Sequence, residues 1–453
     1  MAKGIIVLTE EPVISVGILT DTKIVCELYG SFKVPGIKQD ISGIISLKTK
    51  GENIVCTYNN QNFTNPDEMI FIPADPFSES FLIRDVIIGI DFHWQRKEIQ
   101  RFNHSLKVIR KGDKLIAINN IPLENYIESV ISSEMSAKCS LQSLKAQAIV
   151  SRSWLIAQLE RIDPRKTESE SAQFVQSEYE IIKWYDRKQH EEFDVCADDH
   201  CQRFQGITKV TTENVRQAVL ETRGIVLLHN NNVCDTRYSK SCGGITEGFE
   251  NVWEPVKYPY LESIIDYKYV PENYNLDFSD ETNARKWITG NPSSYCNTVD
   301  KNILSQILID YDQETTNFFR WRITYSQTEI AKIIREKTNI DFGKIKDLVP
   351  VERGASARLI KLKIVGTKKS LTIGKELEIR RVLSTRHLYS SAIVFDKIMK
   401  DSRIPERFIL RGSGWGHGVG LCQVGAAVMA EKGYEFDEIL QHYFSGTDLK
   451  KIY

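Results

Sequence analysis

Residues 121–135 read IPLENYIESVISSEM, and this stretch predicts a helix over Leu123–Met135. Proline is favourable at position 122, at the start of this helix. The first turn needs no N–H there, and the proline φ is already close to helical. Apolar residues recur in this stretch at helical spacing and form one face: Ile127, Val130 and Ile131. Glu134 falls on the same face. The pattern therefore predicts a carboxylate that points into the protein.

An inward carboxylate has two interpretations. Desolvation favours the protonated form of such a group and raises its pKa, which is what a general acid near neutral pH requires. Glu134 could equally be a structural residue that pairs with an arginine or caps a neighbouring helix. The helix alone leaves both interpretations open.

A second helix is predicted over Leu141–Glu160, after a short turn. Arg152 lies on its apolar face, which also holds Leu144, Ala148 and Leu155. A guanidinium in that position could pair with Glu134 or hold a polar substituent of a ligand. It could also belong to a buried ion pair with no role beyond structure.

Residues 411–420, RGSGWGHGVG, carry glycine at every second position. In an extended chain this places the other side chains on one face: Ser413, Trp415, His417 and Val419. A ligand could then lie almost against the backbone, with Trp415 stacking on a ring and His417 donating a hydrogen bond. The spacing matches neither a dinucleotide fingerprint nor a phosphate loop. The alternative is a tight strand crossing with a core tryptophan and a satisfied histidine.

Cysteine and histidine residues raise two further possibilities. His190, Cys196, His200 and Cys201 fall within twelve residues, a density compatible with zinc bound by thiolates and imidazoles, although the spacing is not that of a standard zinc finger. Ordinary reduced cysteines are the alternative. Cys242, in a glycine turn, could act as a thiol nucleophile with His417 as its base.

The rest of the chain predicts an α+β fold, in which a helical segment packs with β-rich subdomains behind a small N-terminal β domain. Short β-rich runs divided by turn residues fill residues 1–112 and predict a sandwich or open barrel. We divide the remainder into 113–270, a polar insertion or docking subdomain at 271–354, and a C-terminal part at 355–453, with the glycine-rich strand and terminal helices.

The amino-acid composition limits the classes of function that the chain can have. The chain has 453 residues, enough for about three domains, and its 59 basic and 60 acidic residues nearly cancel, so no global field favours nucleic acid or an anionic membrane. No run reaches the roughly 18 apolar residues of a membrane-spanning helix. Ile5–Leu8 is too short for the apolar core of an export signal. Nine scattered cysteines indicate a reducing compartment or metal ligation rather than a secreted disulfide framework.

Taken together, several segments resemble the stage II sporulation protein D and amidase-enhancer (SpoIID/LytB) family. Besides the segment that begins at Ile121, the matching stretches are LKAQAIVSRSW (144–154), DVCADDHCQRFQG (194–206), RYSKSCGGITEGFENVWE (237–254), YPYLESI (258–264) and residues 412–453. The resemblance covers about half the chain. Two positions depart from the family pattern: Ser136 stands for a usual proline and Cys422 for a usual serine.

The resemblance implies a lytic transglycosylase that cleaves the glycan strands of peptidoglycan, preferably after an amidase has removed the stem peptides. It maps the catalytic acid onto Glu134. It maps residues near the cleft onto Arg152, Tyr238 and His417, to which the glycine run adds Trp415 as a contact to a sugar ring. The family's structural zinc ligands map onto His190, Cys196 and Cys201, with His200 as a possible substitute. Members are normally exported, which leaves the compartment of this chain open.

Two other function classes remain. A glycan-binding module could stimulate a cell-wall amidase without cutting glycan, and a Cys242/His417 hydrolase would not need Glu134. Within the resembling segments we expect no second inward carboxylate, since Glu124 and Glu128 fall off the apolar face of the first helix and Glu247 follows a glycine turn. A single carboxylate favours the lytic reaction, whose products end in 1,6-anhydro-muramic acid.

Overall fold

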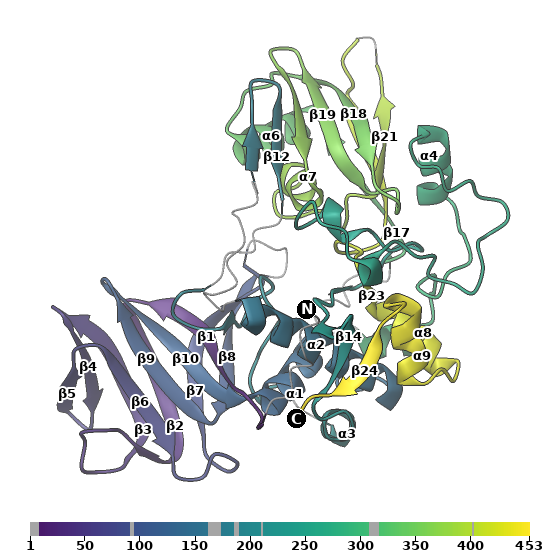
Figure 1. Cartoon of the computed structure of the whole chain (residues 1–453). Coiled ribbons are helices and arrows are strands. Elements are labelled where there is room, and N and C mark those ends of the chain that lie inside the picture. The colour runs from purple at the N-terminus through teal and green to yellow at the C-terminus, as the bar shows by residue number, and fades with distance from the viewer. Residues whose placement is uncertain are drawn as a thin grey trace. The chain divides into compact units, whose positions relative to one another are not determined.

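The computed structural model describes residues 9–90, 95–161, 174–184, 190–209, 212–307, 317–400 and 403–453 (Figure 1). Helices and strands are mixed along the chain, which confirms the predicted α+β class. The chain forms two compact units. The N-terminal unit comprises residues 4–152, 188–226 and 450–453, and the C-terminal unit comprises the remaining residues.

The N-terminal unit is built on one continuous sheet, drawn mainly in purple and blue in Figure 1. Its order is β13-β1-β10-β9-β6-β2-β3-β4-β5, and β7 joins β2 to β8. The strands are β1 (Val13–Asp21), β2 (Lys23–Lys33), β3 (Ile41–Lys50), β4 (Asn53–Tyr58), β5 (Gln61–Asn65), β6 (Glu68–Pro73), β7 (Ser80–Ile88), β8 (Arg96–Asn103), β9 (Ser105–Lys111), β10 (Lys114–Pro122) and β13 (Val195–Cys196).

This sheet extends past the predicted end of the N-terminal β domain at residue 112. The reason is the register of β10, which pairs antiparallel with β1 from Val13↔Pro122 to Asp21↔Leu115. In β1 buried residues alternate with more exposed ones only at its start, whereas β10 is buried at every position from Leu115 to Asn119, so both faces of β10 are covered. Because β10 leads directly into the first helix, the sheet fixes where that helix begins.

The helices of the N-terminal unit lie close to where the sequence predicts them. They are α1 (Leu123–Glu134), α2 (Leu141–Arg161), of which residues up to 152 belong to this unit, and α3 (Glu213–Glu221). Most of α1 is buried, including its serine residues. Between residues 206 and 209, Gly206 makes an isolated bridge to Arg101, and the residues described there form no strand.

The C-terminal unit contains two larger sheets, β11-β12-β20-β19-β18 and β17-β22-β21, the small sheet β16-β23, and most of the small sheet β15-β14-β24, of which residues 225–226 and 450–451 are counted with the N-terminal unit. Their strands are β11 (Phe174–Gln176), β12 (Glu180–Lys183), β14 (Ile225–His229), β15 (Asn232–Val233), β16 (Tyr238–Ser239), β17 (Arg320–Ser326), β18 (Ile345–Arg353), β19 (Leu359–Gly366), β20 (Ser370–Gly374), β21 (Ile393–Ile398), β22 (Arg407–Ser413), β23 (Leu421–Cys422) and β24 (Asp448–Lys451).

The helices of this unit are α4 (Glu281–Thr289), α5 (Lys301–Ile307), α6 (Gln327–Thr338), α7 (Glu376–Val382), α8 (Gln423–Glu431) and α9 (Phe436–Tyr443). One hydrophobic core runs from Trp321 to Leu410 and joins the two larger sheets with α6 and α7. The predicted boundary after Gly354 falls in the turn between β18 and β19, which pair along their length. Residues on both sides of that boundary therefore share one core.

Among the described residues, no helix is both long enough and apolar enough to cross a membrane. The Ile5–Leu8 run, on which the expectation about an export signal rests, lies outside the described residues.

Candidate functional site

Glu134 is the last residue of α1, and its side chain is partly exposed, whereas the preceding turn of the helix is buried. Its Oε1 accepts a hydrogen bond of 3.0 Å from the backbone N–H of Arg203. The Arg203 guanidinium in turn pairs with Asp199 at 2.5 Å. A backbone N–H of a neighbouring loop thus positions the carboxylate of this partly exposed residue, an arrangement compatible with proton transfer to a ligand.

That donor belongs to residues 190–206, which we call the ligand segment because it also carries the predicted metal ligands. The segment lies along α1. Gln202 Oε1 accepts a hydrogen bond from the Tyr126 hydroxyl (3.1 Å), and the Ser129 Oγ accepts one from the Gln205 N–H (3.2 Å). The Phe204 ring stacks on Tyr126 with 5.3 Å between ring centroids. The segment therefore fixes α1 at three successive places, the third being Glu134.

The four predicted metal ligands come together within the ligand segment. The donor atoms of His190, Cys196, His200 and Cys201 all lie within 4.8 Å of one another. Cys201 Sγ is 3.4 Å from His190 Nε2 and 3.5 Å from His200 Nδ1. In a tetrahedral zinc site the sulfur and nitrogen ligands are about 3.5 Å apart, so two thiolates and two imidazoles fit such an ion. The structure thus brings both histidines, not one of the two, to the cluster.

Arg152 does not have Glu134 among its described partners. Its side chain is fully buried, with Nε and Nη2 bonded to the two oxygens of Glu124 at 3.0 and 2.6 Å. Its Nη1 donates to the Ile225 carbonyl at 3.0 Å. The sequence left open a pair with Glu134, a ligand contact and a structural ion pair. The described contacts of Arg152 are those of a buried ion pair.

Glu124 corrects a second expectation. Helical spacing placed it off the apolar face of α1, yet it is only 6% exposed. Besides Arg152, it accepts hydrogen bonds from the Gly224 N–H (3.0 Å) and the Tyr453 hydroxyl (2.5 Å). The buried surface of α1 is wider than its apolar stripe because residues near 224 and the C-terminus cover the helix start. Glu124 is inward, but these four bonds occupy both of its oxygens. Glu247, which was also expected not to point inward, is only 1% exposed and accepts hydrogen bonds from Asn251 and Ser356.

The glycine run of residues 411–420 is not an extended strand beyond Ser413, where β22 ends. Gly414, Gly416, Gly418 and Gly420 all have positive φ, from +70° to +94°. In this left-handed region a side chain is strained, and a Cβ would also collide with neighbours: Arg358 at Gly418 and the Arg237 carbonyl at Gly420. The alternating glycines therefore serve tight backbone packing, and the predicted one-sided extended face is wrong.

Trp415 is 6% exposed and packs in the C-terminal unit against two aromatic rings, Phe318 and Tyr389, each 4.7 Å away between ring centroids. These are the contacts of a core residue. His417 is partly exposed, and its Nδ1 accepts a hydrogen bond of 3.0 Å from the Val419 N–H. Desolvation, followed by the charges of Arg237 and Arg358, holds the pKa of His417 well below its usual 6.5, so the ring is neutral.

Tyr238 lies in β16, partly exposed, and pairs with Leu421 across the short parallel sheet β16-β23. Its neighbour Arg237 was not predicted from the sequence as a site residue. The Arg237 guanidinium pairs with Asp235 at 2.9 Å and lies 4.4 Å from the ring centroid of Trp253. Trp253 meets the His417 ring edge to face at 4.6 Å. Trp253 thus contacts the His417 ring, and the charge of Arg237 helps to lower its pKa. In the sequence, only the aromatic character of Trp253 and the basic character of Arg237 could have indicated a role at the site.

Cys242 does not have the surroundings of a nucleophile. It is 2% exposed, and burial raises the pKa of its thiol well above the usual 9.0. Its Sγ contacts Asp266 Oδ2 and Cys296 Sγ at 3.4 and 3.6 Å. A sulfur atom without access to solvent is a poor nucleophile toward an external substrate, which argues against the Cys242/His417 hydrolase.

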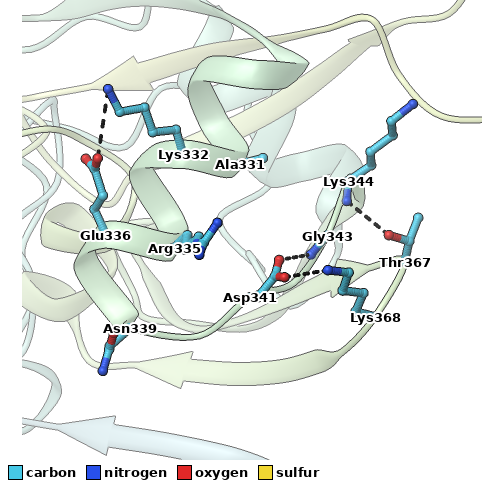
Figure 2. Close-up of a pocket in the computed structure, with 10 residues that line it drawn as sticks. All are labelled: Ala331, Lys332, Arg335, Glu336, Asn339, Asp341, Gly343, Lys344, Thr367 and Lys368. Atoms are coloured by element: carbon cyan, nitrogen blue, oxygen red, sulfur yellow. Dashed lines mark hydrogen bonds and ion pairs between the residues drawn. The ribbon is translucent and has the colours of Figure 1, made fainter.

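A separate pocket of about 850 Å³ lies at the C-terminal end of α6 (Figure 2). Figure 2 shows Asp341 at its centre, bonded to the Gly343 N–H and paired with Lys368 at 2.5 Å. Lys332 pairs with Glu336 on its rim. None of the predicted site residues lines this pocket.

Comparison with known proteins shows which families the chain matches, and over which residues. The model of the family described as "Stage II sporulation protein" matches residues 111–229, which contain α1, α2 and the ligand segment, and a "Domain of unknown function (DUF8618)" matches residues 247–420. Residues 111–229 thus match the stage II sporulation protein family, and two relatives of the chain carry the names of the SpoIID/LytB family.

Named relatives agree with this assignment at low identity. Stage II sporulation protein D of Bacillus subtilis is 22% identical over 350 residues, 77% of this chain and 79% of that protein. The amidase enhancer of Bacillus subtilis is 25% identical over 329 residues, which make up 71% of this chain but only 40% of that protein. An uncharacterized protein of Brachyspira hyodysenteriae is 26% identical over 345 residues, 76% of this chain and 71% of that protein.

Proposed function

We propose that this chain is a peptidoglycan lytic transglycosylase, which cleaves glycan strands between N-acetylmuramic acid and N-acetylglucosamine with Glu134 as general acid and base. Similarity to the SpoIID/LytB family supports the proposal. The observation that carries it is the state of Glu134, a carboxylate that stays partly exposed at the end of a buried helix while a backbone N–H fixes its Oε1. Strands already stripped of stem peptides are the proposed substrate.

One carboxylate suffices for the lytic reaction. Glycosidases with two carboxylates place a second Asp or Glu across the bond, and the other inward acid of α1, Glu124, is bound by Arg152. In the proposed reaction Glu134 protonates the leaving glycosidic oxygen. The 6-hydroxyl of the muramic acid then forms a bond to the anomeric carbon, and the ionised Glu134 takes the hydroxyl proton. The product ends in 1,6-anhydro-muramic acid, and Glu134 is protonated again.

Zinc is the metal that we propose for the ligand segment, because two thiolates and two imidazoles in tetrahedral reach favour it over magnesium or calcium. His190, Cys196, His200 and Cys201 would hold it. A zinc ion with four protein ligands has no open position and supplies only a rigid anchor. The chain's own contribution is then to keep the Arg203 N–H, three residues beyond His200, directed at Glu134.

The proposed substrate contacts differ in their surroundings. Tyr238 and His417 are partly exposed, and the neutral His417 ring suits a hydrogen bond to a sugar hydroxyl. Arg152 and Trp415 are enclosed by their own partners. For those two, direct contact with glycan would require their packing to open, so we propose that Arg152 acts through Glu124 as a positioning residue of α1.

The test uses purified full-length protein and glycan strands freed of stem peptides, with products identified by mass spectrometry. Glu134→Gln should abolish cleavage, because the amide is nearly isosteric but cannot give up a proton. Glu128→Gln is the matched control on the same helix and should cut at the wild-type rate. Cleavage by Glu134→Gln at that rate would remove Glu134 from the mechanism.

Reaction in water enriched in heavy oxygen then separates the two chemistries. The lytic reaction consumes no water, so the new muramic acid ends should be anhydro and unlabelled. Labelled reducing ends as the main product would show hydrolysis instead and refute the one-carboxylate mechanism, even if Glu134 proved essential.

A second candidate function is a glycan-binding enhancer of a cell-wall amidase, which the name of the Bacillus subtilis amidase enhancer favours. An enhancer needs the fold but not a proton donor. Adding the chain to a cell-wall amidase and its peptidoglycan substrate distinguishes the two, since an enhancer keeps its effect in the Glu134→Gln variant and releases no anhydro products by itself.

A further inference from the structure

A second cluster of potential metal ligands lies in the C-terminal unit, in residues that the proposed reaction does not use. Cys242, Asp266, Cys296 and Cys422 come from four separate parts of the sequence, and their ligand atoms all lie within 4.8 Å of one another. Each of the four is at most 2% exposed. We propose that these residues bind a second zinc ion, which holds the glycine run in place.

The distances within the cluster are those of ligands around one tetrahedral ion. Two thiolates on zinc lie about 3.8 Å apart, and a thiolate and a carboxylate oxygen about 3.6 Å. Here Cys242 Sγ is 3.6 Å from Cys296 Sγ and 3.4 Å from Asp266 Oδ2. Three thiolates favour zinc over the hard cations magnesium and calcium.

The surroundings also suit ligands that carry negative charge. The backbone N–H of Cys242 points at Cys422 Sγ (3.2 Å), and the N–H of Gly244 points at Cys242 Sγ (3.4 Å). Hydrogen bonds of this kind stabilise thiolates bound to a metal.

Asp266 is oriented in the same way. Its Oδ1 accepts a hydrogen bond from the Tyr443 hydroxyl at 2.6 Å, which turns Oδ2 toward the sulfur atoms. The N–H of Cys296 and the hydroxyl of Ser294 donate to Oδ2, both at 3.0 Å. A carboxylate with no exposure to solvent is costly without a compensating cation, and His442 Nε2, which lies 3.8 Å from Oδ1, is a cation only when protonated. A zinc ion between the three sulfur atoms and Oδ2 supplies that charge.

The position of the cluster gives the ion its role. Cys422 lies two residues beyond the glycine run, in strand β23. This strand pairs with β16, so that Ser239 faces Cys422 and Tyr238 faces Leu421. Ser241, next to Cys242, exchanges two backbone hydrogen bonds with Trp415. An ion that joins Cys242 to Cys422 would therefore fix the chain on both sides of Trp415 and His417, at Ser241 and at Cys422.

Metal analysis of the full-length protein, purified under reducing conditions without added zinc, tests the proposal. We expect two zinc ions per chain, one from each cluster. Cys296→Ser should reduce the content from two to one. Cys234→Ser, which alters another buried cysteine of the same unit outside the cluster, should leave it at two. A content unchanged by Cys296→Ser would overturn the proposal.

A second measurement does not depend on the folding of Cys296→Ser. In the protein with His190, Cys196 and Cys201 all replaced, the remaining zinc should show three sulfur neighbours and one oxygen by X-ray absorption. Absence of zinc from that protein while it stays folded would refute the second site. So would a Cys242–Cys296 disulfide in protein isolated under reducing conditions, detected by peptide mass.

Discussion

Replacing Arg152 with methionine should lower the free energy of unfolding by about 3–5 kcal/mol, because it leaves the buried carboxylate of Glu124 without its cation. The substitution removes three hydrogen bonds, two to Glu124 at 3.0 and 2.6 Å and one to the Ile225 carbonyl. Bonds to charged groups contribute about 1.5–3 kcal/mol each. The donors from Gly224 and Tyr453 remain on Glu124 and keep the loss near the lower end of the range.

Urea unfolding followed by far-UV circular dichroism provides the measurement, with Arg152→Met, Glu124→Gln and the double variant compared with wild type. The double variant should be more stable than the sum of the single losses predicts, by about 2 kcal/mol, because the two residues interact directly. Arg216→Met, on the exposed surface of α3, is the control and should change stability by less than about 0.5 kcal/mol. Unchanged stability of Arg152→Met together with weaker glycan binding would refute this reasoning and make Arg152 a substrate contact.

Three further predictions follow from the site. Replacing His190, Cys196 and Cys201 together should remove one zinc per chain and lower stability; an unchanged zinc content would exclude the ligand segment as a metal site. Gly418→Ala should destabilise by about 2 kcal/mol or more, because φ is +80° and the methyl group meets Arg358, whereas Gly433→Ala has open space and tests the cost of φ alone. Stability should fall as pH drops below 6.5, by up to about 1.4 kcal/mol per pH unit from His417, since the unfolded chain binds a proton that the folded ring with its lowered pKa does not. The slope should be smaller in His417→Gln, and an equal slope would contradict the assignment of a neutral ring.

The helices of the N-terminal unit could be predicted because their signals are local. A proline before the first turn and apolar residues at helical spacing gave α1 to within one residue at its end, and the same spacing gave α2. The burial of Glu124 could not be predicted in this way. It depends on Gly224 and Tyr453, which are 100 and 329 residues away and cover the start of α1 only in the folded chain.

The glycine run shows a different limit. Glycine at every second position fits both an extended strand and a chain that enters the left-handed region at alternate residues, because composition does not specify the sign of φ. The structure has the second arrangement, with φ of +94° at Gly416 and +80° at Gly418. The consequence for function is direct, since Trp415 lies among aromatic rings instead of on an open face.

The two metal clusters differ in what sequence can reveal. His190 to Cys201 fall within one short segment, so their density was visible, and only the choice between the two histidines needed coordinates. Cys242, Asp266, Cys296 and Cys422 span 180 residues, and no spacing rule connects them. Their proximity follows from the pairing of β16 with β23 and from the turn that brings Ser241 against Trp415.

The ligand segment links the metal cluster to the proposed chemistry through the backbone. The N–H that holds Glu134 belongs to Arg203, two residues after Cys201, so a shift of the cluster moves the donor. The other contacts of the segment, through Gln202 and Gln205, fix the middle of the same helix. A group of potential metal ligands that is far from Glu134 in the sequence is thus part of the structure that positions its carboxylate. The orientation of Glu134 then depends on the order of residues 190–206 as much as on the packing of α1.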